Sequence, residues 1–259
     1  MDERALAESL LAARDSQVFH QRPSERFPGL DLDTAYRVQR HYVDLLRARG
    51  ETPRALKLGL TDFRAQREWG VSAPSYGVLT DRMILEEGIP LSLQSGISPR
   101  VEPEIAVVLA ADLTEEPATL EEVQKAIASV HAGFEIVDPR YADDGFIPVD
   151  AVCDNSATCL AVWSPRGRAA DSADWAAESV VVTIDGVEVA RGTADIVMGN
   201  PLRAVAALAG EMRRRGDLLR RGTVVLTGNV VGQAFAVSAG QTVRAEFSTL
   251  GSLELDVVA

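Results

Sequence analysis

The segment at residues 99–109, PRVEPEIAVVL, constrains the fold more than any other stretch of the chain. In an extended strand, residues i and i+2 share a face, so Glu102 and Glu104 point the same way and apolar residues follow on both faces. A strand that is apolar on both faces is normally buried. Two adjacent carboxylates at the start of such a strand repel each other unless a positive charge lies between them, and a divalent cation is the simplest such partner.

Taken alone, the Glu-x-Glu pattern is more typical of a solvated strand end, with Pro103 marking an edge or a bulge. A third carboxylate adds to the signal, because Glu135 interrupts the apolar run HAGFEIVD at 131–138. Carboxylates in such a group are the hard oxygen ligands that Mg²⁺ and Mn²⁺ prefer, with open positions left for water and substrate. The nearby His131 lies at the end of the preceding predicted helix, and a histidine there more often has a structural role than a role as a metal ligand.

A lysine lies in another short apolar segment, ALKLGL at 55–60. Lysine is rarely buried without a partner, so either Lys57 reaches solvent with its ammonium group or it meets a carboxylate or a substrate inside a pocket. The residues alone leave both alternatives open. The loop-rich stretch at 70–87, which contains PSYG at 74–77, is predicted to form a wall or lid near this strand.

The remaining pattern predicts an α+β fold. Helices are expected at 2–14, at 35–46 with a cap at Asp33 or Thr34, at 62–69, at 120–130 behind a Thr119/Glu122 capping box, and at 201–212 behind Asn200. Further strands are expected at 152–163, on both sides of Asp185-Gly186, and at 223–226, 242–247 and 252–258. Hairpins mix with crossovers, so we expect a mixed sheet curled into a roll or barrel, with a helical region (1–80) packed on a β-roll catalytic domain (81–259) as one structural unit.

Charge and composition exclude several function classes. The net charge of −12 argues against binding to nucleic acid or to an anionic membrane, so small molecules or proteins are the expected partners. The two cysteines, Cys153 and Cys159, suit reduced buried thiols better than a disulfide or a zinc site. Because no leader pattern and no apolar run of membrane-spanning length is present, we expect a cytoplasmic protein. Phosphate-binding glycine loops and the G-x-S-x-G elbow are also absent.

Seven short motifs lie in the order and spacing of one family. They are KLGLT at 57–61, PRVEPEI at 99–105, EIVDPR at 135–140, DN at 154–155, GNPL at 199–202, LTG at 226–228 and LGS at 250–252. In these motifs the chain resembles the 2-keto-4-pentenoate hydratase and 4-oxalocrotonate decarboxylase family, within the fumarylacetoacetate hydrolase superfamily. The resemblance covers nearly the whole chain, and the combination is far more specific than any single motif.

The resemblance implies a β-roll of the fumarylacetoacetate hydrolase C-terminal-domain type, in a homo-oligomer. It implies a Mg²⁺ or Mn²⁺ site formed by Glu102, Glu104 and Glu135, with Lys57 as the catalytic residue. It also assigns Tyr76 and Asn155 to substrate binding. The family degrades aromatic compounds and acts on 2-hydroxydienoic acids or their 2-oxo-enoic tautomers.

Two reactions fit this inventory, since a divalent ion chelated by a 2-oxo acid acts as a Lewis acid toward the enolate in both. In a hydratase, the dienol of 2-hydroxypenta-2,4-dienoate is protonated at its far end, water adds to C4 and a proton reaches C3, which gives 4-hydroxy-2-oxopentanoate. Lys57 is the candidate proton carrier, or the group that holds the enolate oxygen. In a decarboxylase, CO₂ leaves from the far end of 2-oxohex-3-enedioate (4-oxalocrotonate).

The chain departs from the family pattern at several positions. Hydratases usually carry PDFG where this chain has PSYG, so the expected acid is absent at Ser75, as it also is in the decarboxylases. DPRY at 138–141 is closer to the decarboxylases, whereas VDAVCD at 149–154 leans towards the hydratases, and NSA at 155–157 replaces the usual NAS. We lead with the hydratase and keep the decarboxylase as the alternative.

A hypothesis from another class is a weakly active, metal-binding subunit that serves as partner to a homologous pathway enzyme. The missing acid at Ser75 motivates it. The retention of Lys57 and all three glutamates argues against it, since a purely structural partner has no physical need for clustered buried carboxylates.

Overall fold

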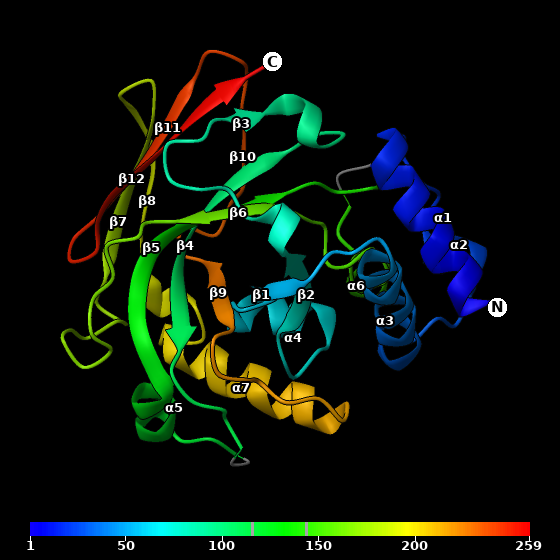
Figure 1. Ribbon diagram of the computed structural model, residues 1–259, viewed down its shortest axis with the longest axis horizontal. Helices are drawn as coiled ribbons and strands as arrows, with labels where there is room; N and C mark the ends of the chain where they lie inside the picture. The colour runs from blue at the N-terminus through cyan, green and yellow to red at the C-terminus, as the bar shows by residue number, and fades with distance from the viewer. Residues whose placement is uncertain (115–116, 143–144) are drawn as a thin grey trace.

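The computed structural model describes residues 1–114, 117–142 and 145–259 as two β-sheets with helices around them (Figure 1). Within these residues, the larger sheet has the strand order β2-β1-β9-β4-β5-β6, with β10 paired to β4 as a seventh strand. The smaller sheet has the order β3-β12-β11-β7-β8. The β1–β9 and β12–β3 pairs are parallel and the other pairs are antiparallel, so both sheets are mixed.

The strands have the following bounds: β1 Pro53–Gly59, β2 Ser75–Thr80, β3 Leu91–Ser92, β4 Arg100–Leu109, β5 Ile127–Val137, β6 Thr158–Trp163, β7 Ser179–Ile184, β8 Val187–Thr193, β9 Val224–Asn229, β10 Phe235–Ala236, β11 Thr242–Phe247 and β12 Gly251–Val258. The helices are α1 Glu3–Ser16, α2 Pro23–Arg26, α3 Leu32–Ala48, α4 Phe63–Trp69, α5 Leu120–Ala126, α6 Pro148–Cys153 and α7 Pro201–Arg214, with 3₁₀ turns at Asp81–Met83, Leu93–Ser95 and Ala194–Ile196.

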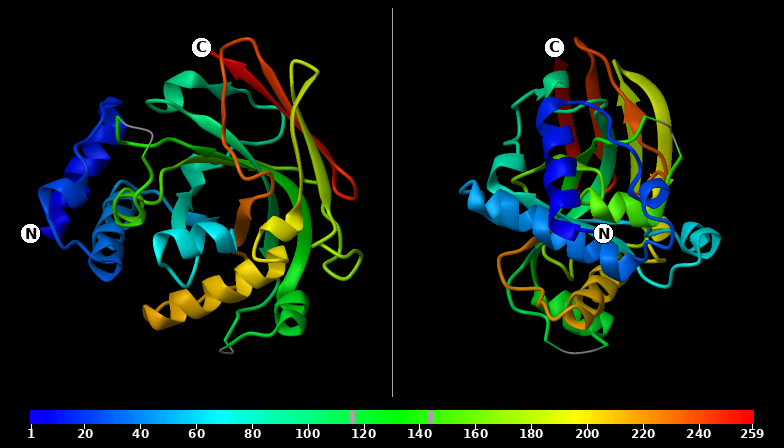
Figure 2. Two further views of the ribbon diagram at one scale, coloured as in Figure 1. Left: turned by 180° about the vertical axis from the view of Figure 1, so that it is seen from behind. Right: turned by 90° about the vertical axis from the view of Figure 1, so that its right-hand side faces the viewer.

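Strand β4 is the central strand of the larger sheet. It pairs along its length with β5 on one side and with β9 on the other, and its residues Val101, Ile105 and Val107 have no exposed surface. The run that reads as apolar on both faces is therefore buried on both faces, as a central strand requires. The long strands β4 and β5 curve strongly, and the sheet rolls around the interior of the molecule (Figure 2). The predicted mixed β-roll is confirmed.

The N-terminal helices lie on one side of the roll. Helix α3 packs against α1 and α6, next to the edge of the larger sheet that ends in β2 (Figure 1). Helix α7 runs beneath the sheet and packs on β9. Strands β1 and β2 come from the first 80 residues but pair in the same sheet as β4, so the division at residue 80 stays a prediction. None of the helices in the described part of the chain has both the length and the apolar character needed to cross a membrane.

Three local predictions differ from the structure. Helix α5 ends at Ala126, and the apolar stripe assigned to its continuation begins β5, because the β-branched residues Ile127 and Val130 pair with β4 instead. Residues 148–153, partly predicted as strand, form α6, and β6 starts only at Thr158. Helix α3 is capped two or three residues earlier than predicted, by Asp31, whose carboxylate accepts a hydrogen bond from the amide of Thr34 at 2.8 Å.

The capping box of α5 is present as predicted. The Thr119 hydroxyl accepts from the amide of Glu122, and the Glu122 carboxylate accepts from the amide of Thr119 at 2.7 Å. We expect Thr119→Ala to lower the free energy of unfolding by about 1 kcal/mol, because the amide of Glu122 loses its hydroxyl acceptor and the reciprocal pair of hydrogen bonds is broken. Thr119→Ser should retain most of this stability. Urea unfolding of the three proteins measures the difference, and equal midpoints for Thr119→Ala and the parent would contradict it.

Candidate active site

Strand pairing brings the three predicted carboxylates together. Glu102 on β4 lies directly opposite Glu135 on β5, and Glu104 follows Glu102 on the same face of β4. One carboxylate oxygen from each residue lies within 4.8 Å of the others. Glu104 and Glu135 have no exposed surface, whereas Glu102 is partly exposed. These three residues are called the glutamate cluster below.

Lys57 reaches the same cluster from a strand that is distant in sequence. Strand β1 pairs with β9 at Lys57 and Leu226, and β9 pairs in turn with β4 at Ala106. The Lys57 ammonium lies 3.0 Å from Glu135 Oε1, and the whole residue is 5% exposed. Of the two alternatives left open by the sequence, the structure therefore shows the one in which Lys57 meets a carboxylate inside a pocket.

The cluster carries more negative charge than Lys57 can balance. Burial, with Glu135 and Glu102 close by, raises the pKa of Glu104 well above its usual range. Burial also raises the pKa of Glu135 to about 7, although Lys57 opposes the shift. Burial alone would lower the pKa of Lys57, but Glu135, Glu102 and Glu104 outweigh it and raise that pKa. The lysine therefore remains an ammonium ion at neutral pH, while the carboxylates favour either protons or a cation.

The donor set of the cluster fits a hard divalent cation. Glu104 Oε2 accepts a hydrogen bond from the amide of Gly228 at 2.8 Å, but Glu104 Oε1 and Glu135 Oε2 are buried and have no hydrogen-bond donor among the described residues. Buried carboxylate oxygens without donors are costly unless something positive binds them. Carboxylate oxygens are the ligands that Mg²⁺ and Mn²⁺ take.

The contact with Gly228 depends on that residue being glycine. Its φ of +118° is one that other residues rarely adopt, and a Cβ there would lie 2.1 Å from the hydroxyl oxygen of Thr61. Only a glycine allows the backbone of β9 to approach both Thr61 and Glu104. The LTG motif therefore has a packing reason, which the sequence alone did not reveal.

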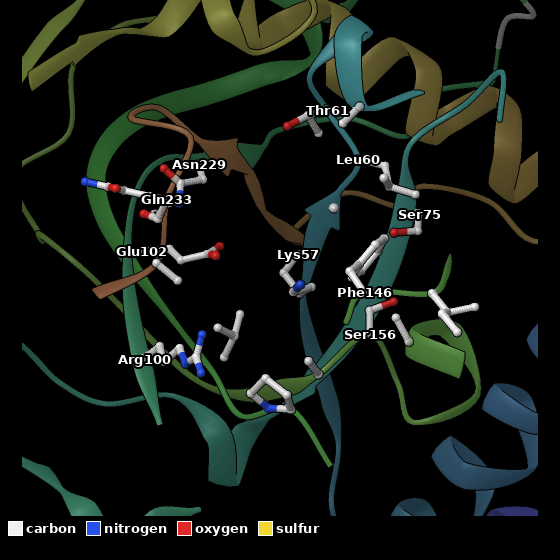
Figure 3. A pocket seen from close by; sticks show the side chains of 18 of the residues that line it. Lys57, Leu60, Thr61, Ser75, Arg100, Glu102, Phe146, Ser156, Asn229 and Gln233 are labelled. Atoms are coloured by element: carbon white, nitrogen blue, oxygen red, sulfur yellow. Dashed lines mark hydrogen bonds between the residues drawn. The ribbon is translucent and has the colours of Figure 1, made fainter. Parts of the chain in front are cut away.

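A cavity of about 600 Å³ opens above the cluster (Figure 3). Lys57 points into it from β1 and Glu102 from β4, so these two residues present the cluster to the cavity. Its other polar lining includes Thr61, Ser75, Arg100, Asp154, Ser156 and Asn229. Phe19, Trp69 and Phe146 add apolar surface, as is typical of a pocket for a small organic molecule. The stretch predicted to form a wall near Lys57 contributes Ser75.

The structure does not bring Tyr76 and Asn155 to this cavity surface. The Tyr76 ring stacks on Tyr36 at a centroid distance of 5.0 Å. The Asn155 side chain accepts from the amide of Val78 and donates to its carbonyl, at 2.8 Å each, and has no exposed surface. Both side chains are therefore engaged in holding β2 in place, and their predicted substrate contacts stay a prediction.

Asp154 is the cavity residue that the sequence reasoning did not select. It follows α6, is 1% exposed and lines the cavity. Burial raises its pKa to about 6, against the opposing charges of Arg140 and Lys57. The DN motif marked this position in the sequence, but no local pattern indicated that the side chain would enter a cavity.

The turn after Asp154 has an unusual backbone. Asn155, Ser156 and Ala157 have φ values of +65°, +59° and +56°, so three successive residues other than glycine are left-handed. Each costs roughly 1–2 kcal/mol, and such strain persists only where the surroundings hold it. Here the Asn155 side chain holds Val78, and the Ser156 hydroxyl donates to the carbonyl of Tyr76 at 2.9 Å.

The raised pKa of Glu135 predicts how the stability of the metal-free protein depends on pH. The folded protein takes up a proton at Glu135 that the unfolded chain, with its lower pKa, has already lost. Because the folded state then binds more protons than the unfolded state, the contribution of Glu135 to the free energy of unfolding depends on pH. This contribution is fully present below about pH 4.5 and is lost as the pH rises through about 7, a change on the order of 3 kcal/mol. Urea unfolding in a chelator from pH 5 to 8.5 should show a steeper fall for the parent than for Glu135→Gln. Parallel curves would contradict the expectation.

Comparisons with known proteins agree with this fold. Residues 38–258 match the family described as fumarylacetoacetate (FAA) hydrolase C-terminal. The chain is 37% identical over 226 residues to a 2-keto-4-pentenoate hydratase of Burkholderia vietnamiensis, covering 87% of this chain and 86% of the relative. It is 29% identical over 227 residues to a 4-oxalocrotonate decarboxylase of Pseudomonas putida, covering 88% and 86%.

A solved structure is similar over almost the whole chain. The 4-oxalocrotonate decarboxylase of Pseudomonas putida G7, in complex with magnesium and adipate, superimposes with a TM-score of 0.95 at 30% identity, covering 99% of this chain and 97% of that one. The family and lyase class predicted from the sequence are thereby confirmed. The chain belongs to the fumarylacetoacetate hydrolase C-terminal family.

Proposed function

We propose that this protein is a divalent-metal-dependent lyase that hydrates 2-hydroxypenta-2,4-dienoate to 4-hydroxy-2-oxopentanoate. The observation that carries the proposal is the buried glutamate cluster with Lys57 at the floor of one cavity. The substrate class comes from the relatives, which are named as hydratases and decarboxylases of short unsaturated 2-oxo acids.

Glu102, Glu104 and Glu135 would hold the metal, Mg²⁺ or Mn²⁺. The two buried carboxylate oxygens without donors support this assignment, as does the presence of magnesium or calcium in the related decarboxylase structures. When bound, the ion supplies Lewis-acid stabilisation of negative charge on the oxygens of a 2-oxo acid. The backbone amide of Gly228 keeps Glu104 oriented toward the other two carboxylates.

Lys57 holds and moves a proton at its Nζ atom. The ammonium group is anchored by Glu135 and lines the cavity, so it is within the same volume as a bound substrate. The glutamate cluster keeps it charged, and it can therefore donate a proton to a substrate carbon or hold a developing enolate oxygen. Phe19, Trp69 and Phe146 give the cavity wall an apolar part, against which the carbon chain of a substrate can pack.

Decarboxylation of 2-oxohex-3-enedioate is the alternative activity. It is favoured by Ser75, which places a hydroxyl where an acid would serve hydration, and by the close superposition with the decarboxylase. Hydration leads because the hydratase relatives reach 37% identity, whereas the decarboxylases reach 29% and 32%. The cluster serves either reaction, since both need a stabilised enolate.

The assembly belongs to the proposal as well. We expect a homo-oligomer, with a small-molecule 2-oxo acid as substrate. The hypothesis of a weakly active partner subunit predicts a stable complex with a homologous pathway enzyme and no turnover by the purified protein.

An ultraviolet assay distinguishes these functions. With Mg²⁺ or Mn²⁺ present, we expect loss of the dienoate absorbance and a product heavier by one water in mass spectrometry, while 2-oxohex-3-enedioate loses no CO₂. Chelation should abolish the reaction, and Lys57→Met should lower kcat at least 100-fold, because the site loses its proton donor. CO₂ release from the dioate would establish the alternative, and a lack of reaction with either acid would contradict both.

The metal assignment can be tested without turnover. Glu104→Gln resembles the protonated acid in shape but lacks a charge for the cation, so we expect Mg²⁺ affinity in calorimetry to fall at least tenfold with the fold intact. Glu178→Gln is a matched control. Glu178 is also a buried glutamate with one oxygen lacking a donor, but its carboxylate accepts from the amide of Thr249 and lies outside the cluster. Equal affinities for both variants would refute the assignment.

A further inference from the structure

Asp154 is a buried carboxylate that the glutamate cluster does not use. Its Oδ1 accepts a hydrogen bond from the amide of Ala157 at 2.8 Å, while Oδ2 is buried and has no hydrogen-bond donor among the described residues. The residue lines the same cavity as Lys57. A buried carboxylate oxygen is costly to leave without a hydrogen-bond donor. In a cavity for a small molecule, the donor can be a molecule that enters with the substrate, such as water.

The strained turn fixes the position of this carboxylate. The left-handed backbone of Asn155, Ser156 and Ala157 turns the chain back on itself and lets the amide of Ala157 hold Oδ1. The two hydrogen bonds between Asn155 and Val78 tie the turn to β2. Backbone strain of this kind concentrates at functional sites, where it holds a side chain in a position that an unstrained backbone would not give it.

The same turn packs beside Lys57. Gly77 on β2 lies opposite Lys57 on β1, and a Cβ at Gly77 would lie 2.5 Å from the carbonyl oxygen of Asn155 and 3.1 Å from Lys57 Cδ. The absence of a side chain at Gly77 is therefore what allows the turn to approach the lysine. The carboxylate of Asp154 and the ammonium of Lys57 are thus held by elements in direct contact.

Among the described residues, the pKa of Asp154 and that of Glu135, the carboxylate partner of Lys57, lie between 5 and 8. Its charged and titratable neighbours are Arg140, Lys57, Tyr141 and Cys153. The pKa values of Arg140 and Lys57 are raised, so both stay positive, and burial raises those of Tyr141 and Cys153, so both stay neutral. Ser75, the cavity residue on β2, carries only a hydroxyl. Glu135 belongs to the glutamate cluster and is paired with Lys57, so Asp154 is the carboxylate outside the cluster that can accept a proton at neutral pH.

We propose that Asp154 is the general base of hydration, which takes a proton from the water molecule that adds to C4. The water oxygen forms a bond to C4 as one of its O–H bonds breaks, and that proton goes to Asp154. The electron pair of the C3–C4 double bond becomes the C2–C3 double bond of an enolate, and the pair of the C2–O double bond moves onto the 2-oxygen. The C2–C3 pair then takes a proton at C3 from Lys57, and the C2–O double bond re-forms. Proton exchange with solvent restores both residues, so one water is added and no oxidant is needed. The inference rests on the proposed hydratase function.

The test is Asp154→Asn in the metal-loaded enzyme, since asparagine retains the oxygen that Ala157 holds. We expect kcat for hydration to fall at least 100-fold, whereas protonation of the dienol at its far end continues. In D₂O the variant should therefore convert 2-hydroxypenta-2,4-dienoate to 2-oxopent-3-enoate that carries deuterium at C5 and contains no added water. Mg²⁺ affinity should equal that of the parent.

Asp138→Asn is the control for loss of a buried carboxylate nearby. Asp138 is 1% exposed, accepts from the amide of Ser98 and pairs with Arg140, but it does not line the cavity, so hydration should continue within threefold of the parent rate. If Asp154→Asn hydrates the dienoate with a kcat within threefold of the parent value, the inference about Asp154 is overturned, whereas the proposed function is not. A parent that does not hydrate the dienoate overturns the proposed function and the inference together.

The parent enzyme supplies a measurement that needs no variant. Its kcat/KM for hydration should fall below about pH 6, as Asp154 becomes protonated and can no longer accept a proton. A flat profile from pH 5 to 8 overturns the inference even where Asp154→Asn fails to fold.

Discussion

The charge imbalance among three buried carboxylates and one ammonium is the constraint on which the rest of this structure depends. Glu104 and Glu135 have no exposed surface, and Lys57 contacts only one of them directly. Such a group is unfavourable unless a cation completes it, so the surrounding fold must hold the carboxylates together against their repulsion. The roll does this with two paired strands, β4 and β5, whose residues around the cluster are mostly apolar and buried.

The two sides of the cavity are built by different means. The cluster is placed by regular strand pairing: β5 sets Glu135 opposite Glu102, and β1 and β9 bring Lys57 and the Gly228 amide from distant parts of the chain. Positions on paired central strands are fixed by many backbone hydrogen bonds and tolerate little displacement. The side that carries Asp154 is instead a short helix and a strained turn, which is held to β2 by the Asn155 side chain.

This difference also explains what could be predicted from the sequence. Glu102 and Glu104 were predictable as neighbours because alternation along a strand is a local pattern. The contact of Lys57 with Glu135 was not, because it depends on the order β1-β9-β4, which pairs distant segments. The α5–β5 boundary was misplaced because a stripe of apolar residues fits both periods near Ile127. Tyr76 and Asn155 were assigned from resemblance, which identifies a residue but does not say which way its side chain points. Asp154 was marked by the DN motif, but a left-handed Asn is usually a single residue, so three successive left-handed residues were not predictable.

A site divided in this way separates the part of the chemistry that related enzymes share from the part in which they differ. Relatives named as hydratases and as decarboxylases both match the chain over more than four-fifths of its length. Stabilising a 2-oxo acid as its enolate is common to both reactions, and under the proposed function it is the task of the cluster and Lys57. What differs is whether water adds or CO₂ leaves at the far end of the substrate, and that end must meet groups outside the cluster. The wall formed by β2 and the Asp154 turn lies outside the cluster, so under the proposed function it is where the choice of reaction can change.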